Sequence, residues 1–157
     1  TAAELNLDHP LIDLRSLRPE KGMMVDGVLQ DIQVVNVDGK PVNVEIAMNV
    51  AMLLEEARSE GVNLSIGNSH RSVETQAGLR ITNGCPDIHE SPASSCRVPT
   101  ARPGRSNHQD GKAIDFQFNG GSIPHGSAGF EWLVENAERY GLYNLPSESW
   151  HWSVNGH

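Results

Sequence analysis

The chain has 157 residues, with 20 acidic side chains, 12 basic side chains and a formal net charge of −8 at pH 7. This length suits one domain with its own hydrophobic core, and the acidic balance argues against a basic face that binds nucleic acid. No apolar run in the sequence is long enough to span a bilayer. We therefore expect one monomeric domain over residues 1–157, without a nucleic-acid partner and without a transmembrane segment.

Residues 1–44 contain short apolar stretches broken by turn signals. Two Asp-Gly pairs, at positions 26–27 and 38–39, favour tight turns. We predict an irregular N-terminal lead-in that includes a hairpin around residues 29–44.

Helical patterns mark three segments of the rest of the chain. Apolar residues at helical spacing predict helices over residues 45–58 and 127–140, the second with Val134 on its buried face. Ser72 can cap a shorter helix that ends near residue 81. Each helix is followed by a glycine or a loop, which favours an end there.

Strand patterns lie between these helices. Apolar alternation predicts strands over residues 62–66 and 112–118, and a last strand runs through residues 150–152. The order of helices and strands predicts an α+β domain, with helices packed on a small, mostly antiparallel sheet.

The two cysteines, Cys85 and Cys96, bracket an irregular stretch rich in proline and serine. A disulfide here would close a short loop and contribute on the order of 2 to 3 kcal/mol in the chain-entropy model. Such bonds persist in oxidising compartments, so the pair favours a secreted or cell-envelope protein. The alternative is two thiols that bind a metal, but their spacing matches no common zinc pattern. Thr1 in place of methionine fits a processed start.

Two polar motifs carry the donors of a metal site. Residues 106–115 contain His108 and Asp115, and the later Glu-Ser-Trp-His run at 148–151 contains His151. Two imidazoles and one carboxylate form the donor set of many catalytic zinc sites, which keep one position open for water. Bound zinc lowers the pKa of water to about 7, and amide hydrolysis also needs a carboxylate that moves the proton. The motifs therefore predict a zinc hydrolase with one Zn²⁺ ion.

The predicted strand over residues 112–118 places Asp115 on the polar face. Ile114 and Phe116 lie on the opposite, apolar face. Aspartate is depleted in strands and costly to bury without a partner, and a metal supplies that partner. An Asp-Gly pair between His108 and the strand is a turn signal that can bring the imidazole back beside Asp115.

These motifs resemble those of the zinc D-Ala-D-Ala peptidases of the VanY and VanX kind. The family pattern S-x-H-x-x-G-x-A-x-D matches residues 106–115, and the family's E-x-W-H matches residues 148–151, with Ser149 where proline is usual. The wider fold group includes lysostaphin-type endopeptidases and the Hedgehog signalling domain.

A third family motif lies upstream. Residues 68–76 resemble G-Y-R-S-x-x-x-Q, with Ser69 and His70 in place of its glycine and tyrosine. The resemblance covers roughly residues 44–153 with the motifs in the family's order, so residues 45–157 are the expected catalytic core.

The resemblance implies a role for each matched residue. His108, Asp115 and His151 would bind zinc, and Glu148 would act as general base and then general acid. Arg71 would hold the substrate's carbonyl oxygen or carboxylate, a role that suits a permanently charged fork of donors.

Other assignments are open to simpler explanations. Ser106 and Gln76 are further candidates for substrate binding. Glu148 can also be read as an ordinary surface carboxylate, and Arg71 as the partner of Glu74. Four of the other five histidines lie near the termini or in loops, where we expect solvated side chains: His9, His89, His125 and His157. His70 is an intermediate case.

We therefore predict a secreted or envelope zinc peptidase that acts on peptidoglycan stem peptides and removes a terminal D-Ala. Within the enzyme class, the alternatives are a D-Ala-D-Ala dipeptidase and an endopeptidase of the phage-lysin kind. In another class, the alternative is a non-catalytic zinc domain that binds cell-wall peptide or a protein. Glu148 favours an enzyme, because a binding domain has no need of a base beside its zinc.

Overall fold

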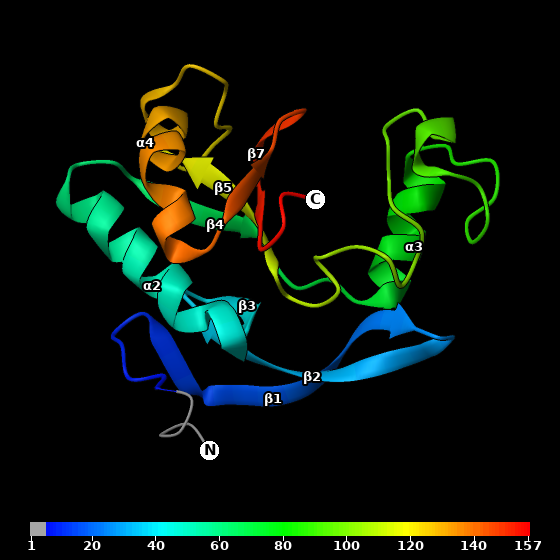
Figure 1. Cartoon of the computed structure of the whole chain (residues 1–157), viewed down its shortest axis with the longest axis horizontal. Coiled ribbons are helices and arrows are strands. Elements are labelled where there is room, and N and C mark those ends of the chain that lie inside the picture. Colours follow the sequence, from blue (N-terminus) through cyan, green and yellow to red (C-terminus); the bar gives the residue numbers. More distant parts are fainter. Residues whose placement is uncertain (1–5) are drawn as a thin grey trace.

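The computed structural model describes residues 6–157 of the chain. Over this range the chain forms one α+β domain with two antiparallel sheets and three α-helices (Figure 1). The main core lies between helix α2 (Val44–Ser59) and the four-stranded sheet, and helix α4 (Ala128–Asn136) contributes to it. Residues buried in this core include Val50, Leu53, Leu54, Leu64, Ile114, Phe116 and Leu133.

The N-terminal sheet has the order β1-β2-β3. Its strands are β1 (Ile12–Val25), β2 (Val28–Val37) and β3 (Lys40–Asn43). The hairpin predicted around residues 29–44 is confirmed as β2 and β3. The prediction of one small sheet is incomplete, because this sheet is separate from the one that carries the metal motifs.

The irregular lead-in predicted before the hairpin is wrong for residues 12–25, which form strand β1. Strands β1 and β2 run along one edge of the molecule as a long arm that reaches from below α2 to below α3 (Figure 1). Leu14, Val25 and Val28 on this arm are exposed. Because much of the arm has no core on either face, its sequence lacks the apolar alternation that marks a half-buried strand.

The second sheet has the order β4-β5-β7-β6. Strands β4 (Leu64–Asn68), β5 (Ala113–Phe118) and β7 (Glu148–Ser153) confirm the three predicted strands within a few residues. The short strand β6 (Tyr143–Leu145) was not predicted. Central strand β5 pairs with both β4 and β7, so the residues of β5 meet two partners across the sheet.

The helices start where the sequence predicts. Helix α2 covers the first predicted helix, and α3 (Val73–Thr82) begins after Ser72, whose Oγ accepts a hydrogen bond from the amide of Thr75 at 3.0 Å. Helix α4 continues into a 3₁₀ turn, η2 (Ala137–Tyr140). Val134 is 53% exposed, so its predicted burial is wrong; Trp132, two residues earlier, is buried instead.

Helix α3 and the loop after it form a lobe beside the second sheet (Figure 1). The predicted disulfide between Cys85 and Cys96 is present in this lobe, which also contains the short 3₁₀ turn η1 (Ala93–Ser95). Arg80 of α3 is fully buried, and its guanidinium donates to the carbonyl oxygens of Ile88 at 2.9 Å and Thr100 at 2.7 Å. The same guanidinium also reaches the carbonyls of Asp87 and Ser91. One side chain thus holds several turns of an irregular loop against the helix.

Candidate metal centre

His108, Asp115 and His151 converge at one end of the second sheet. Nε2 of His108 lies 3.1 Å from Oδ1 of Asp115, and Nδ1 of His151 lies 3.0 Å from the same oxygen. The three donor atoms all lie within 4.8 Å of one another, and both imidazoles are buried. The predicted convergence is therefore found, and the cluster is a possible metal site.

Strand pairing places two of these side chains. Asp115 on β5 is the direct partner of His151 on β7 in the antiparallel ladder. His108 comes from the loop before β5, which turns at Gly111 with a φ of +65°. A Cβ at Gly111 would lie 2.8 Å from the backbone nitrogen of Asn43, so both the turn and the packing require glycine.

Backbone carbonyls orient both imidazoles. Nδ1 of His108 lies 2.7 Å from the carbonyl oxygen of Ser69, and Nε2 of His151 lies 2.7 Å from that of His157. A carbonyl oxygen only accepts, so each of these outer nitrogens carries the proton. Without a second proton, each inner nitrogen directs its lone pair at the carboxylate of Asp115, an arrangement that a cation between the three groups stabilises. When no cation is bound, a proton on the inner nitrogen of His151 takes its place and is donated to Asp115 in a hydrogen bond.

The protonation equilibria reflect this arrangement. Burial raises the pKa of Asp115, but hydrogen bonds from His108 and His151 outweigh it and hold the pKa well below its usual range. Burial lowers the pKa of His151, but the hydrogen bonds to Asp115 and to the carbonyl of His157 outweigh it and raise the pKa above its usual value. The carboxylate is thus ionised over the whole ordinary pH range, as metal binding requires.

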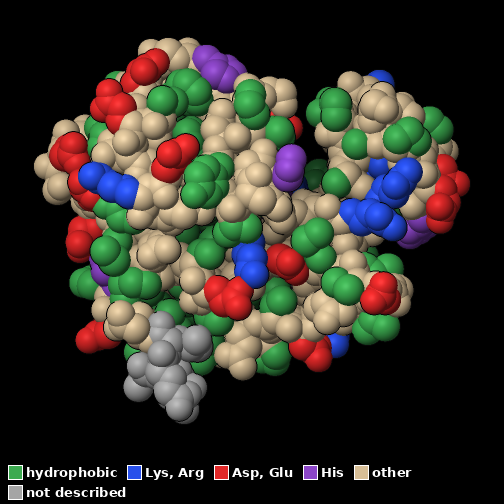
Figure 2. Space-filling view, in the orientation of Figure 1, with side chains coloured by type: hydrophobic (Ala, Val, Ile, Leu, Met, Phe, Trp, Pro, Cys, Tyr) green, Lys and Arg blue, Asp and Glu red, His purple; other side chains and the backbone are tan. Residues whose placement is uncertain are grey.

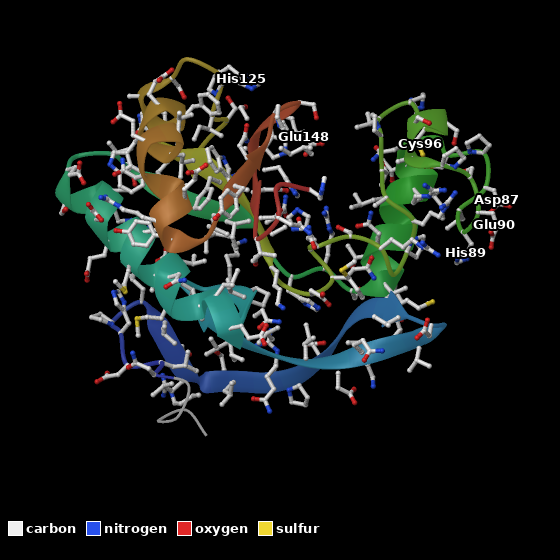
Figure 3. All side chains as sticks on the ribbon, in the orientation of Figure 1. Asp87, His89, Glu90, Cys96, His125 and Glu148 are labelled. Atoms are coloured by element: carbon white, nitrogen blue, oxygen red, sulfur yellow. A yellow bond between two sulfur atoms is a disulfide. The ribbon has the colours of Figure 1, made fainter. Side chains whose placement is uncertain are left out.

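Glu148 lies at the start of β7 and extends toward the α3 lobe (Figure 3). Its Oε2 is 3.8 Å from Nδ1 of His151, and the side chain is about one-third exposed. The carboxylate therefore faces the open side of the possible metal site, where water and a substrate have access. The labelled His89 lies on the outer side of the α3 lobe and His125 on the loop before α4 (Figure 3), and neither lines the cleft around these donors.

Arg71 reaches the same site from the segment between β4 and α3. Its backbone amide donates to the carbonyl of His108 at 2.8 Å, which fixes the residue beside the metal motif. Burial lowers the pKa of its guanidinium, while the charges of Asp115 and Glu148 oppose that shift. Its buried Nε has no partner within residues 6–157, and no ion pair joins it to Glu74. The guanidinium thus keeps a donor free.

Ser106 and Gln76 line the cleft, and each side chain already makes one hydrogen bond within the protein. Oγ of Ser106 accepts from the amide of His108 at 3.2 Å, so the hydroxyl supports the metal loop. Nε2 of Gln76 donates to the carbonyl of Ala101 at 2.9 Å. The buried Oε1 of Gln76 has no partner in the described range, which leaves one acceptor available in the cleft wall.

These residues share one cleft of about 350 Å³ between the second sheet and the α3 lobe. Figure 2 shows the hollow between the two parts of the molecule. The C-terminus lies at this gap (Figure 1), and His157 contributes to the lining. The site residues in the lining are Arg71, Gln76, Ser106, His108, Asp115, Glu148 and His151. The structure thus brings together every candidate except the two cysteines.

Three supporting contacts were missed in the sequence. Two of them are the backbone carbonyls of Ser69 and His157, which carry no residue-type signal. The third is Asp110, whose Oδ1 accepts from the amide of Met23 and so joins the β1–β2 arm to the metal loop. The Asp-Gly pair indicated a turn but gave no sign of this distant partner.

Comparisons with known proteins agree with this geometry. The sequence model of the family described as VanY, D-alanyl-D-alanine carboxypeptidase, matches residues 39–157. A search of curated proteins found no match.

Several solved structures have a similar fold. One is the vancomycin resistance D,D-pentapeptidase VanY from a VanB-type resistance cassette, a mutant in complex with Zn(II), with 20% identity and a TM-score of 0.58 over 96% of this chain and 86% of that one. VanYB in complex with D-alanine-D-alanine matches at 20% identity and a TM-score of 0.55, over 92% of this chain and 86% of that one. The L,D-carboxypeptidase LdcB matches at 21% identity and a TM-score of 0.58, over 95% of this chain and 70% of that one. No helix within residues 6–157 is long and apolar enough to cross a membrane.

Proposed function

The chain belongs to the VanY D-alanyl-D-alanine carboxypeptidase family, and we propose that it removes the terminal D-alanine from peptidoglycan stem peptides. The family consists of zinc-dependent peptidases. One observation carries the proposal: the two imidazoles and the carboxylate of the possible metal site share a cleft with an acid-base candidate, Glu148, and a cation, Arg71.

The three donors are proposed to be His108, Asp115 and His151. A zinc ion held by them would supply Lewis acidity and would lower the pKa of bound water to about 7. The outer protons of the imidazoles, held by the carbonyls of Ser69 and His157, keep the inner nitrogens available for the metal.

Glu148 and Arg71 are the proposed groups that act on the substrate. Glu148 accepts the proton of the attacking water and later gives it to the leaving amine nitrogen. Arg71 offers its free donors to the oxygen on which negative charge develops, or to the terminal carboxylate. Both lie in a partly enclosed cleft, where such interactions are stronger than in bulk water.

A second candidate function is that of an L,D-carboxypeptidase, which differs in the configuration of the residue before the scissile bond. The neighbour LdcB is an L,D-carboxypeptidase, so the fold also occurs in enzymes that cut after an L-configured residue. The disulfide and a cell-wall substrate both support a location outside the cytoplasm, either secreted or in the envelope.

The test is digestion of a muropeptide pentapeptide by the purified protein, with mass detection of the fragment lost. We expect loss of one alanine, abolished by a chelator and restored by added zinc. Loss of a larger fragment would indicate an endopeptidase, and cleavage of a tetrapeptide alone would indicate an L,D-carboxypeptidase. No cleavage by the zinc-loaded protein would favour the non-catalytic binding domain.

A further inference from the structure

The segment after β7, residues 154–157, turns back toward the metal cleft (Figure 1). Gly156 makes the reversal possible, because its φ of +79° lies in the left-handed region that favours glycine. The amide of His157 donates to Oδ1 of Asn155 at 3.1 Å, which holds the end of the turn. The carbonyl oxygen of His157 then lies 2.7 Å from Nε2 of His151, the contact that orients this proposed ligand.

Asn107 joins this segment to the loop that carries His108. Its Nδ2 donates to Oδ1 of Asn155 at 2.7 Å and to the carbonyl oxygen of His157 at 3.0 Å. These acceptors lie 48 and 50 positions further along the chain. Each hydrogen of the carboxamide nitrogen thus has its own acceptor. Because a backbone carbonyl only accepts, the nitrogen end of the Asn107 carboxamide must face the segment.

The carbonyl oxygen of His157 connects Asn107 to the metal centre. A backbone carbonyl has two lone pairs, and this one accepts from Nε2 of His151 and from Nδ2 of Asn107. The bond from Asn107 therefore fixes the carbonyl in the position that receives the imidazole proton of His151. A histidine whose outer N–H is held in this way presents its other nitrogen to a metal in one tautomer and one ring orientation.

The imidazole of His108 is oriented without this segment, although His108 is the sequence neighbour of Asn107. Its outer nitrogen, Nδ1, lies 2.7 Å from the carbonyl oxygen of Ser69, which follows β4. The two imidazoles thus depend on different parts of the chain. An effect of Asn107 on the segment can therefore be distinguished from an effect on its own loop.

We propose that Asn107 is a positioning residue of the metal centre: through the carbonyl of His157 it holds the imidazole of His151 in the orientation that binds zinc through Nδ1. The inference rests on the proposed function, because it takes His151 as a ligand. The motif that includes Ser106 and His108 leaves the position between them open, so it assigns no role to Asn107. The role arises from the contacts with residues 154–157.

The test variant is Asn107→Ala, and Asn155→Ala removes the other side chain of the same network. Asn136→Ala is the matched control, because Nδ2 of Asn136 also donates to a backbone carbonyl, that of Trp132 at 2.8 Å, and the residue does not line the cleft. Competition with a chelator measures the zinc Kd of each protein.

Loss of a group that hydrogen-bonds to a metal-binding side chain costs about 10- to 100-fold in metal affinity. Asn107 acts one bond further out, so we expect the zinc Kd of Asn107→Ala to rise by about tenfold, the lower end of that range. Asn136→Ala should keep the wild-type Kd. The double variant Asn107→Ala/Asn155→Ala should lose less than the product of the two single effects, because both residues act through one carbonyl.

NMR of the zinc-loaded protein with isotope-labelled histidine separates positioning from a general loosening of the loop. In the wild type we expect slow exchange with water for the Nε2 proton of His151 and for the Nδ1 proton of His108. Asn107→Ala should speed exchange at His151 and leave His108 unchanged. A role confined to the loop would give the opposite pattern, because His108 is the adjacent residue.

Wild-type zinc affinity in both Asn107→Ala and Asn155→Ala would overturn the inference, and so would faster exchange at His108 in place of His151. Failure of the proposed function is a distinct result: the wild-type protein would bind zinc and leave the pentapeptide uncut, and the metal measurements would still decide the role of Asn107. A wild-type protein that binds no zinc would overturn both. Thermal unfolding of each variant shows whether the fold is intact.

Discussion

The carboxylate of Asp110 accepts a hydrogen bond from the backbone amide of Met23 at 2.6 Å, across 87 positions of the chain. A second bond, from the amide of Met24 to the carbonyl of Gly104 at 2.8 Å, joins the same two segments. The family match begins at residue 39, so these contacts bring a strand from outside the matched region against the loop that carries His108. A Cβ at Gly22 would collide with the Asp110 carboxylate, so this glycine permits the approach.

Replacing Asp110 with alanine should therefore loosen the metal loop. We expect the free energy of unfolding to fall by about 1.5–3 kcal/mol, the usual worth of a hydrogen bond to a charged group. Zinc affinity should fall as well, because His108 lies two residues away. Urea unfolding and competition with a zinc chelator measure the two effects. Asp31→Ala, which removes an exposed carboxylate from the same arm, is the control and should change neither.

Replacing His151 with alanine should remove one proposed ligand and leave the fold intact. Loss of a group that hydrogen-bonds to a metal-binding side chain costs about 10- to 100-fold in metal affinity. Loss of the metal-binding side chain itself should cost more. Metal analysis after dialysis measures the zinc retained per chain. His125→Ala, on an exposed loop, should retain full zinc. Tightly bound stoichiometric zinc in His151→Ala would contradict the ligand set.

Replacing Glu148 with glutamine should separate zinc binding from turnover. The variant keeps the size of the side chain but cannot accept the proton of water, so kcat should fall by about 10²–10⁴-fold. Zinc content should match that of the wild type, because Glu148 is not among the three donors. Steady-state kinetics on the pentapeptide, with metal analysis of the same sample, measure both. Full activity would exclude Glu148 as the base.

Zinc affinity should rise with pH. Because the pKa of His151 is raised in the metal-free site, a proton competes with zinc up to a higher pH than for an ordinary histidine. Below that pKa, affinity should rise about tenfold per pH unit for the one proton displaced, and it should level off above it. Chelator competition at a series of pH values measures the slope. A profile that already levels off at about pH 6.5, the pKa of an ordinary histidine, would contradict the shift.

The same pKa shift has the opposite consequence for the stability of the metal-free protein. Protonated His151 is stabilised in the folded state, so its contribution is fully present below the unfolded pKa of about 6.5 and is lost as pH rises through the higher folded value. Unfolding of the chelated protein across this window measures the loss, and added zinc should reverse it.

Replacing Arg80 with methionine should destabilise the α3 lobe. The buried guanidinium satisfies the carbonyls of Ile88 and Thr100 among others, and methionine leaves them without donors. We expect a loss of about 3 kcal/mol or more, at about 1–3 kcal/mol for each buried group left unpaired. Arg15→Met, at an exposed site on β1, is the control. Chemical denaturation measures both, and amide exchange in residues 85–101 locates the effect.

The sequence by itself determined the parts of the protein that depend on local spacing. Alternation in β5 placed Asp115 on the polar face, the Asp-Gly pair indicated the turn that returns His108, and Ser72 marked the start of α3. The disulfide followed from two cysteines that bracket an irregular loop. Side-chain identity at short range is sufficient in each case, because strand alternation and helix caps are themselves local.

Only the tertiary structure decided the rest. Strand β1 pairs with β2 largely outside the core, so apolar alternation gave no sign of it, and the contact between Asp110 and Met23 joins residues far apart in sequence. The carbonyls of Ser69 and His157 orient the imidazoles, yet every residue has a backbone carbonyl and its use leaves no mark in the sequence. The cleft likewise arises only when β5, β7 and the α3 lobe come together, because each contributes part of its lining.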